Sequence, residues 1–378
     1  MLKLIKSYLK FFYKRIIIIF FLKIYGKPTY KEKFKNDYFN SINLKIKKKN
    51  YKIYEIKNGR VFTNKNDITA YITKNNVLVD GSMQFKKFDN INSKNQLLKK
   101  NSTLHDGTNS FKRKINGNIL SLLSGGAARD NFTHWFTDVI PRIFLFTKKY
   151  KLKIIKKFYV PSIKYNFQKE SLELLKIKSN QLISSELINH VEGKKIFYTS
   201  HPCHFYPSKM EKWSLEELRN IYIPKNIKKN NKYKNIFIDR DQLKLIDKNK
   251  IKNYASWRVL LNENEIKKFL KSKGFLILKP EDFSFKQQIK IFYNASFVIS
   301  LFGAAMMMIA FCNKKVKIIE IKPQKSGNEF KNISDKLNLK HEQIKIKPKF
   351  KSSTPQNGLL FCDLQLINAK LKKLNFKH

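Results

Sequence analysis

The chain has 378 residues, 42% hydrophobic and 13% aromatic, which is enough for two folded domains and excludes a disordered protein. Its formal net charge is +50, but the 78 basic residues are spread along the chain and only eight of them are arginine. This spread argues against specific nucleic-acid binding and favours an anionic membrane surface or substrate as partner. Three widely spaced cysteines predict no disulfide framework and indicate a reducing compartment.

Residues 1–26 form a basic, aromatic N-terminal segment. Its uninterrupted apolar run, Ile16–Leu22, is too short to span a membrane, and no small-residue cleavage site follows. Lysines interleaved with Phe, Tyr and Ile favour a helix that lies on an anionic leaflet. The alternative is a first helix that docks on the core or frays.

Residues 27–223 are predicted to form a first lobe that begins with short strands and continues with helices. Apolar residues recur at helical spacing from Asn131, which predicts a helix there, and Ser214 with Glu217 is placed as a capping box. The expected strands are Tyr51–Ile56, Thr69–Ile72, Asn76–Val79, Asn118–Leu123, Lys157–Val160, Gln181–Ser184 and Lys195–Thr199, and the later helices are Phe167–Leu175 and Ser214–Asn220.

A lysine- and asparagine-rich break, Pro224–Lys234, predicts a linker to a second lobe, residues 235–345. Strands and helices alternate there, which predicts a parallel, doubly wound sheet. A tail, residues 346–378, is expected to end in a helix from Leu359 to Leu374 that crosses back to the first domain. The expected elements of the second lobe are strands Asn235–Asp239, Phe275–Lys279, Phe297–Leu301 and Lys315–Ile321, and helices Asn262–Lys273, Ser284–Ala295, Ala304–Phe311 and Gly327–Leu337.

The end of the strand Phe297–Leu301 predicts a phosphate site. The apolar run stops at Gly303, the small residues Ala304 and Ala305 follow, and a helix begins after them. Backbone N–H groups at such a turn face outward at the positive end of the helix dipole. The carboxyl edge of an open α/β sheet is also where ligands bind. An ordinary structural turn is the alternative.

Several sequence blocks occur in an order that carries a family resemblance. They are Gly125–Phe146 with its Asn131, His134-Trp135, Asp138 and Pro141-Arg142; Asn235–Arg240; Arg258 with Asn262 and Glu263; Gly274-Phe275, Pro280-Glu281 and Ser284-Phe285 with Gln288; Gly303–Ala305; and Glu320 with Pro323. Together, from about Gly125 to Leu339, they resemble glycosyltransferase family 61, known from bacterial capsule clusters. The chain departs from the family pattern at Phe302, where His is usual, at Asp239, where Ser is usual, and in the methionines that follow the turn.

The resemblance implies an α/β protein of the GT-B type, with two Rossmann-like doubly wound lobes and a cleft between them. It implies a nucleotide-sugar donor, which we expect to be a UDP-sugar, inversion at the anomeric carbon, and no metal or other cofactor. It also places Asn262, Glu263 and Gln288 in blocks on the donor side. Asn131 and Trp135 fall in the block that we assign to the acceptor side.

Transfer from a nucleotide sugar requires stabilisation of a leaving diphosphate, which without a metal falls to cations and backbone N–H groups. Arg240 and Arg258 are the candidates, because a guanidinium binds phosphate oxygens in a fork that lysine cannot copy. The Gly303–Ala305 turn would add N–H groups. Glu320, at the same sheet edge, can accept both ribose hydroxyls. The alternatives are salt bridges for the arginines and a capping or ion-pair role for Glu320.

The acceptor hydroxyl must also lose a proton. His134 and Asp138 are four residues apart on one helix face, so they can act as base and orienter, or Asp138 can act alone. The alternative is a packed histidine with Asp138 paired to Arg142. Trp135 can stack on a sugar or belong to the core, and Arg142 can hold an anionic acceptor or brace the lobe.

The metal-ligating residue types do not form a recognisable site. His201-Pro-Cys203-His204 lacks a second ligand pair, and the Asp239-Arg240-Asp241 spacing is interpreted as chance, so we expect no metal. No Gly-x-Gly-x-x-Gly follows a first strand, which argues against an epimerase or dehydrogenase.

The leading hypothesis is a cytoplasmic transferase, peripheral to the inner membrane, that acts on a lipid-linked or polysaccharide acceptor in capsule or lipopolysaccharide assembly. The alternative is a non-catalytic glycan- or nucleic-acid-binding protein on a degenerate transferase fold. The loss of the usual histidine at position 302 is its main support.

Overall fold

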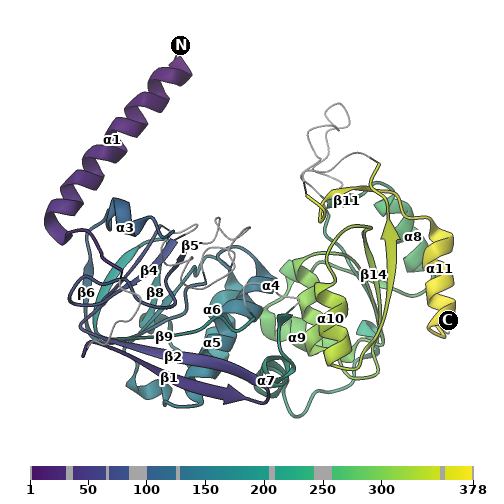
Figure 1. The fold of residues 1–378 in the computed structure, drawn as a ribbon. Helices are drawn as coiled ribbons and strands as arrows, with labels where there is room; N and C mark the ends of the chain where they lie inside the picture. Colours follow the sequence, from purple (N-terminus) through teal and green to yellow (C-terminus); the bar gives the residue numbers. More distant parts are fainter. Residues whose placement is uncertain are drawn as a thin grey trace. The chain divides into compact units, whose positions relative to one another are not determined.

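The computed structural model describes residues 2–30, 37–64, 68–84, 100–124, 128–203, 209–241, 258–349 and 354–376. The chain divides into two compact units, Met1–Phe205 and Tyr206–His378 (Figure 1). Each unit contains helices and a sheet with parallel strands, so the expected α/β class is confirmed. The first block of the family resemblance begins at 125–127, which lie outside the described residues.

The boundary between the units precedes helix α7 (Lys212–Tyr222), whereas the sequence placed it after this helix, at Pro224–Lys234. Helix α7 packs within the second unit, because Arg219 Nη1 donates to the carbonyls of Ala310 and Cys312, both at 2.7 Å. The helix also begins earlier than expected, after an N-cap at Glu211. The capping box predicted at Ser214 is therefore wrong.

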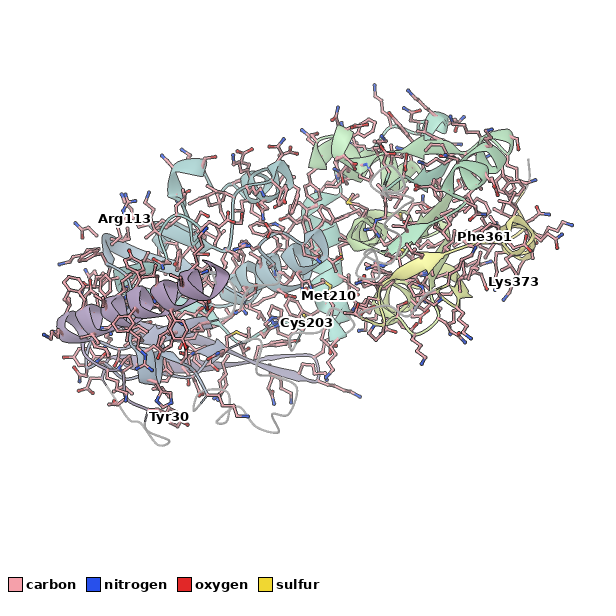
Figure 2. All side chains as sticks on the ribbon, turned by 90° about the horizontal axis from the view of Figure 1, so that it is seen from above. Tyr30, Arg113, Cys203, Met210, Phe361 and Lys373 are labelled. Carbon is pink, nitrogen blue, oxygen red and sulfur yellow. The ribbon has the colours of Figure 1, made fainter. Side chains whose placement is uncertain are left out.

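The N-terminal segment forms one helix, α1 (Leu2–Tyr25), as expected. Only its last turns pack on the first unit: the Phe21 ring lies 4.9 Å from that of Phe111, and the Tyr25 ring lies 5.3 Å from that of His190. Most of its other described side chains are exposed. Figure 2 shows the described side chains of the chain as sticks. In the part of the chain that the structure describes, no helix is both long and apolar enough to cross a membrane.

The described strands of the first unit form a nine-stranded sheet. Strand β1 pairs antiparallel with β2, and β3 pairs antiparallel with β4, whereas β6 pairs parallel with β7 and β9. The sheet is therefore mixed and not the doubly wound one expected. Asn76–Val79, expected as a strand, makes only isolated bridges. The strands are β1 (Phe39–Ile46), β2 (Lys49–Lys57), β3 (Arg60–Thr63), β4 (Ile68–Ile72), β5 (Met83–Gln84), β6 (Arg113–Ser121), β7 (Lys157–Val160), β8 (Leu182–Ser184) and β9 (His190–Thr199).

Helices cover this sheet and carry the candidate base. Helix α5 packs on β9, where the Phe146 ring meets that of Phe197 at 5.4 Å. Among the described residues, the α- and π-helices of the unit beyond α1 are α3 (Thr103–Asp106), α4 (Phe132–His134), the π-helix η2 (Trp135–Val139), α5 (Ile140–Thr147) and α6 (Asn166–Leu174), and η3 (Leu152–Ile154) and η4 (Ser179–Gln181) are 3-10 helices.

The second unit has the doubly wound architecture that the sequence predicts. Its five-stranded sheet is parallel throughout, in the order β12-β10-β13-β14-β15. A separate parallel pair joins β11 (Arg258–Leu260) to β16 (Gly358–Leu360). The sheet strands are β10 (Asn235–Ile238), β12 (Leu276–Leu278), β13 (Phe297–Leu301), β14 (Lys317–Pro323) and β15 (Lys340–Ile346), with helices α8 (Glu263–Ser272), α9 (Phe285–Asn294), α10 (Glu329–Lys336) and α11 (Leu364–Lys373).

Two expectations for this unit need correction. The segment Ala304–Phe311 is a 3-10 helix, tighter than the α-helix expected there. The C-terminal helix, α11, does not cross back to the first unit. Its Ile367 and Leu371 are buried in the second unit's own core, together with Ile344 of β15.

Candidate functional site

The order of the strands in the second unit defines where a ligand would bind. Counted along the chain, the sheet order is 2-1-3-4-5, so the direction of winding reverses between β10 and β13. In doubly wound sheets, the carboxyl ends of the strands at this switch point form the binding crevice. Arg240 follows β10 and Gly303 follows β13, so two residues predicted to bind the donor lie at the switch point.

The main-chain carbonyl of Phe302 brings the two predicted phosphate-binding arginines together. Arg240 Nη1 donates to it at 3.0 Å, and Arg258 Nη1 donates to the same oxygen. The Arg258 guanidinium also lies over the Phe302 ring, 4.6 Å from its centre. Burial and the neighbouring charge of Arg240 lower the pKa of Arg258 to about 9. Two partly desolvated cations side by side are an arrangement that a polyanion would stabilise.

Gly303 leaves room for the close approach of Arg240. A Cβ atom at this position would lie 2.6 Å from Arg240 Nη1 and 3.0 Å from its Cζ. The backbone of Gly303 is extended, so any residue could adopt its conformation. Ala304 and Ala305 are half-buried at the start of the 3-10 helix. The turn therefore lets the guanidinium lie against the main chain.

Three other residues assigned to the donor are instead held by protein contacts. Asn262 pairs with the backbone of Cys362 through both ends of its amide, at 2.8 and 3.1 Å. The Gln288 amide donates to the carbonyls of Pro280 and Phe283. Both are buried, as is Glu263 at the start of α8, whose carboxylate lies 3.8 Å from Lys267 Nζ. These contacts favour structural roles.

Glu320 lies on β14 and is fully buried. Its Oε2 accepts from the Gln343 amide at 2.6 Å and lies 3.3 Å from His341 Nε2. This burial argues against the predicted contact with ribose. Its charge still acts on the site, because it opposes the lowering of the Arg258 pKa.

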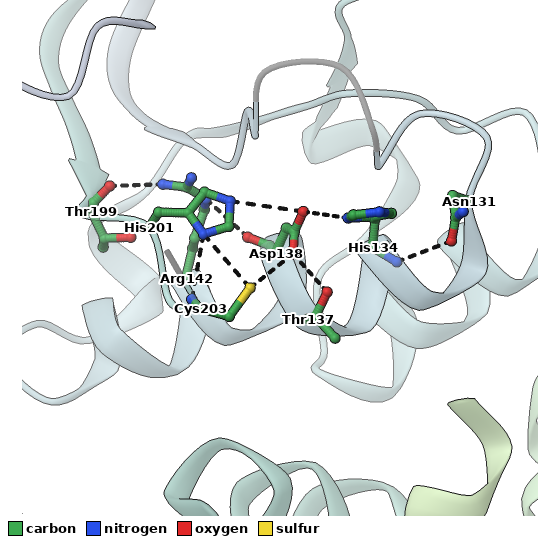
Figure 3. Close-up of polar contacts among 8 residues, drawn as sticks. All are labelled: Asn131, His134, Thr137, Asp138, Arg142, Thr199, His201 and Cys203. Atoms are coloured by element: carbon green, nitrogen blue, oxygen red, sulfur yellow. Dashed lines mark hydrogen bonds and ion pairs between the residues drawn. The ribbon is translucent and has the colours of Figure 1, made fainter. Parts of the chain in front are cut away.

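The first unit contains the predicted His–Asp pair. His134 Nδ1 lies 2.8 Å from Asp138 Oδ2 (Figure 3). The side chain of Asp138 is only 2% exposed, whereas that of His134 is 20% exposed. The imidazole is therefore the member of the pair that can meet a substrate, with the carboxylate behind it as orienter.

The local backbone around this pair is a π-helix, which the sequence did not predict. Pro141 has no N–H and its ring would clash with the carbonyl four residues earlier in an α-helix. The wider π-turn over Trp135–Val139 avoids that conflict, since Ile140 N bonds to the carbonyl of Trp135, five residues back. Asn131 caps the start of the helix by accepting from His134 N at 3.2 Å. Asn131 thus fixes the backbone of the candidate base.

Asp138 is a buried carboxylate surrounded by donors. Thr137 Oγ1 and Cys203 Sγ both lie within hydrogen-bond distance of its Oδ1, at 2.6 and 3.2 Å. Burial alone would raise the pKa of Asp138, but the charge of His201 and the hydrogen bond from His134 outweigh it and lower the pKa to about 2. Because Asp138 is ionised, the proton between the pair belongs on His134 Nδ1, which leaves Nε2 as the basic nitrogen.

The sequence missed that His201 and Cys203 lie beside Asp138. Their ligand atoms and an Asp138 oxygen all lie within 4.8 Å of one another, the one group of this kind among the residues that the structure describes. Burial and the Asp138 charge raise the pKa of the Cys203 thiol well above its ordinary value. The buried Arg142 is also near. A protonated thiol and a guanidinium disfavour a divalent cation here, so the group is best described as a hydrogen-bonded support for Asp138. His204, the fourth residue of the sequence cluster, lies outside the described residues.

Trp135 and Arg142 are the two other residues predicted on the acceptor side, and their contacts favour the structural alternatives. Trp135 has no exposed surface, and its Nε1 donates to Ser171 Oγ at 2.9 Å. It is a core residue and offers no face to a sugar. Arg142 is buried and donates to the carbonyls of Asp138 and Thr199, at 2.9 and 2.7 Å. It braces the helix that carries Asp138 against β9.

The comparison with protein families identifies one matching family. Residues 132–319, about half of the chain, match the family model of Glycosyltransferase 61. The matched stretch contains the His134–Asp138 pair and both arginines, and it supports assignment of the chain to that family. No curated protein matches the chain.

Proposed function

With the glycosyltransferase 61 match as premise, we propose that the protein transfers a sugar from a nucleoside-diphosphate sugar to a hydroxyl group, with inversion and without a metal. The observation that carries the proposal is the convergence of Arg240 and Arg258 on the Phe302 carbonyl at the switch point of a parallel sheet. A GT-B arrangement of the two units, with a UDP-sugar as donor, is part of the proposal.

The roles of the residues follow from the charges that the reaction creates. As the bond between the anomeric carbon and the diphosphate breaks, negative charge grows on the leaving oxygens, and Arg240 and Arg258 would stabilise it. The oxygen of the acceptor hydroxyl would attack the anomeric carbon on the face opposite the leaving diphosphate. His134 Nε2 would take the proton of that hydroxyl as it attacks. The Asp138 carboxylate would stabilise the imidazolium that forms.

The exposed helix α1 supports a membrane setting for this reaction. Its sequence contains no Asp or Glu, and Lys6, Lys10, Lys14, Arg15 and Lys23 are exposed. Ten large apolar side chains between Ile5 and Ile24 are exposed as well. Apolar and basic side chains together suit the interface of an anionic membrane. We propose that the acceptor is a lipid-linked or growing glycan of capsule or lipopolysaccharide assembly at the cytoplasmic face of the inner membrane.

A second function is favoured by one observation. The carboxylate expected to hold the donor ribose, Glu320, is buried and occupied by Gln343. A chain that cannot bind a donor would act as a glycan-binding protein on a transferase fold. Donor binding decides between the two functions.

The first experiment is a thermal-shift screen against UDP, GDP, CMP and their sugar conjugates in the absence of metal. A ligand at one hundred times its Kd adds about 2.7 kcal/mol of stability, which is readily measured. We expect one nucleotide class to stabilise the protein and Arg258→Lys to abolish the shift, whereas Arg113→Lys, on an exposed arginine, should leave it unchanged. Stabilisation by none of these compounds would favour the glycan-binding alternative.

Transfer is tested separately from donor binding. His134→Gln is expected to retain the thermal shift with the donor and to lose about 10²- to 10⁴-fold in turnover, which is the usual contribution of a general base. Equal activity of wild type and His134→Gln would refute the assigned base.

A further inference from the structure

A cationic cavity in the first unit is not explained by the proposed reaction. It has a volume of about 590 Å³ and is formed by the β2–β3 turn, the end of β4, and strands β6 and β9. The strands β6 and β9 lie side by side (Figure 1). None of the residues assigned to the transfer reaction lines it. Its charged lining residues are Arg60, Lys74, Lys112, Lys114, Lys194 and Glu192.

Arg60 is the buried member of this set, with 8% of its surface exposed. Its Nη2 donates to Asn76 Oδ1 at 2.6 Å, and its guanidinium lies 5.6 Å from the centre of the Tyr25 ring. Its Nε has no hydrogen-bond partner among the described residues. Burial lowers the pKa of Arg60, and the charge of Glu192 opposes this effect. A buried guanidinium that is not fully hydrogen-bonded is costly unless an anion completes its environment.

The charges around Arg60 are not balanced within the cavity. Glu192, the one carboxylate of the lining, forms an ion pair with Lys112. Lys74, Lys114 and Lys194 are exposed at the rim. Five cations against one carboxylate suit an anion with more than one negative charge, and a guanidinium suits phosphate oxygens in particular.

We propose that this cavity binds a phosphate ester, of the diphosphate class, with Arg60 at its base and the rim lysines around it. The ligand has two candidate sources, a membrane lipid headgroup or a soluble phosphate compound. Tyr25, the last residue of α1, contributes to the same surroundings, since its hydroxyl accepts from Lys112 N at 3.1 Å. The cavity thus adjoins the end of the helix for which we propose a membrane role, but phosphate binding does not depend on that role or on the transfer reaction.

The test measures binding of inorganic diphosphate by calorimetry at low salt to the full chain carrying Arg258→Lys, which removes a phosphate contact of the proposed donor site, and the variants below are made in this background. Lys114→Gln/Lys194→Gln removes two exposed cations of the rim. The matched control is Lys45→Gln/Lys169→Gln, which makes the same charge change at exposed positions outside the cavity. We expect the rim variant to weaken binding at least tenfold and the control to change it less than twofold. Arg60→Gln should abolish binding, and the rim variant keeps the test valid if Arg60→Gln does not fold.

Vesicles containing phosphatidic acid distinguish the two sources. Weaker vesicle binding by the rim variant than by the control would assign the headgroup as the ligand. Unchanged vesicle binding, with diphosphate binding still weakened, would assign a soluble phosphate compound. Two results would overturn the proposal. The first is that the rim variant binds both diphosphate and vesicles as tightly as the control variant does. The second is that glucuronate, which carries a carboxylate and no phosphate, binds as tightly as diphosphate.

Discussion

Replacing Asp138 by asparagine is expected to remove a pH-dependent part of the free energy of unfolding. The pKa of the buried carboxyl lies at about 2, against an ordinary value of 3.8, because His201, His134 and Thr137 together outweigh the effect of burial. At about 1.4 kcal/mol per pKa unit, this difference corresponds to roughly 2 kcal/mol in favour of the folded state when the carboxyl is ionised.

The sign of the effect follows from the direction of the shift. The folded protein has the lower pKa, so the stabilisation is complete above the unfolded value and is lost as the pH falls through both values. The difference in unfolding free energy between wild type and Asp138→Asn should therefore shrink as the solution becomes more acidic. We expect a decrease of about 1 kcal/mol between pH 5 and pH 3, and of about 2 kcal/mol by pH 2.

Urea denaturation followed by circular dichroism at pH 5, 4 and 3 measures this difference. Asp37→Asn, at an exposed carboxyl, is the matched control and should follow the wild-type pH dependence. If wild type and Asp138→Asn lose stability in parallel over this range, the carboxylate is not stabilised by the two histidines. The proposed orientation of the base would then have no electrostatic support.

The remaining predictions concern the cation pair, the core and α1. Gly303→Ala should displace the Arg240 guanidinium and weaken nucleotide binding about tenfold or more, measured by calorimetry, because the new Cβ would lie 2.6 Å from Nη1; unchanged affinity would show that Arg240 is not needed. Trp135→Phe should lower the free energy of unfolding by about 1–2 kcal/mol through loss of the hydrogen bond to Ser171, with no change in the acceptor KM; an altered KM at unchanged stability would restore the acceptor role. Lys10→Glu/Lys14→Glu should reduce cosedimentation with anionic vesicles at least tenfold while leaving neutral vesicles unaffected, and equal binding to both kinds of vesicle would argue against a lipid-facing α1.

The sequence predicts the second unit better than the first because its pattern is local. Apolar runs of strand length alternate with helical periodicity, and β13 was placed at its observed bounds. The first unit depends on contacts that periodicity does not show. Strand β9 was expected only at its end, Lys195–Thr199, yet its earlier residues pair with β3. The mixed sheet of the first unit also depends on which strands pair with which, and residue propensities do not show this.

The candidate site was predicted only in part, because sequence patterns show local contacts and not contacts between distant segments. The i, i+4 spacing of His134 and Asp138 identified a contact within one helix. The pairing of Arg240 with Arg258 joins distant segments, and both arginines were identified from residue type together with the family resemblance of the blocks that contain them. The proximity of His201 and Cys203 to Asp138 had no local signal, although their occurrence together in the sequence marked the segment. Asn262 and Gln288 were assigned to the donor site, but their amides bind the backbone instead. A sequence does not distinguish an amide that holds the backbone from one that binds a ligand.

The use of a main-chain oxygen to hold the two arginines has a consequence for how this turn can vary. Every residue type supplies a carbonyl at position 302, so replacement of the family's usual side chain by phenylalanine leaves the anchor of both guanidiniums in place. The two hydrogen bonds that hold the cation pair therefore do not depend on the side chain at 302, although the Phe302 ring adds a contact with the Arg258 guanidinium. A missing motif residue at this turn is then poor evidence that a chain has lost its donor site, and Gly303 and the two arginines are better positions by which to judge divergent relatives.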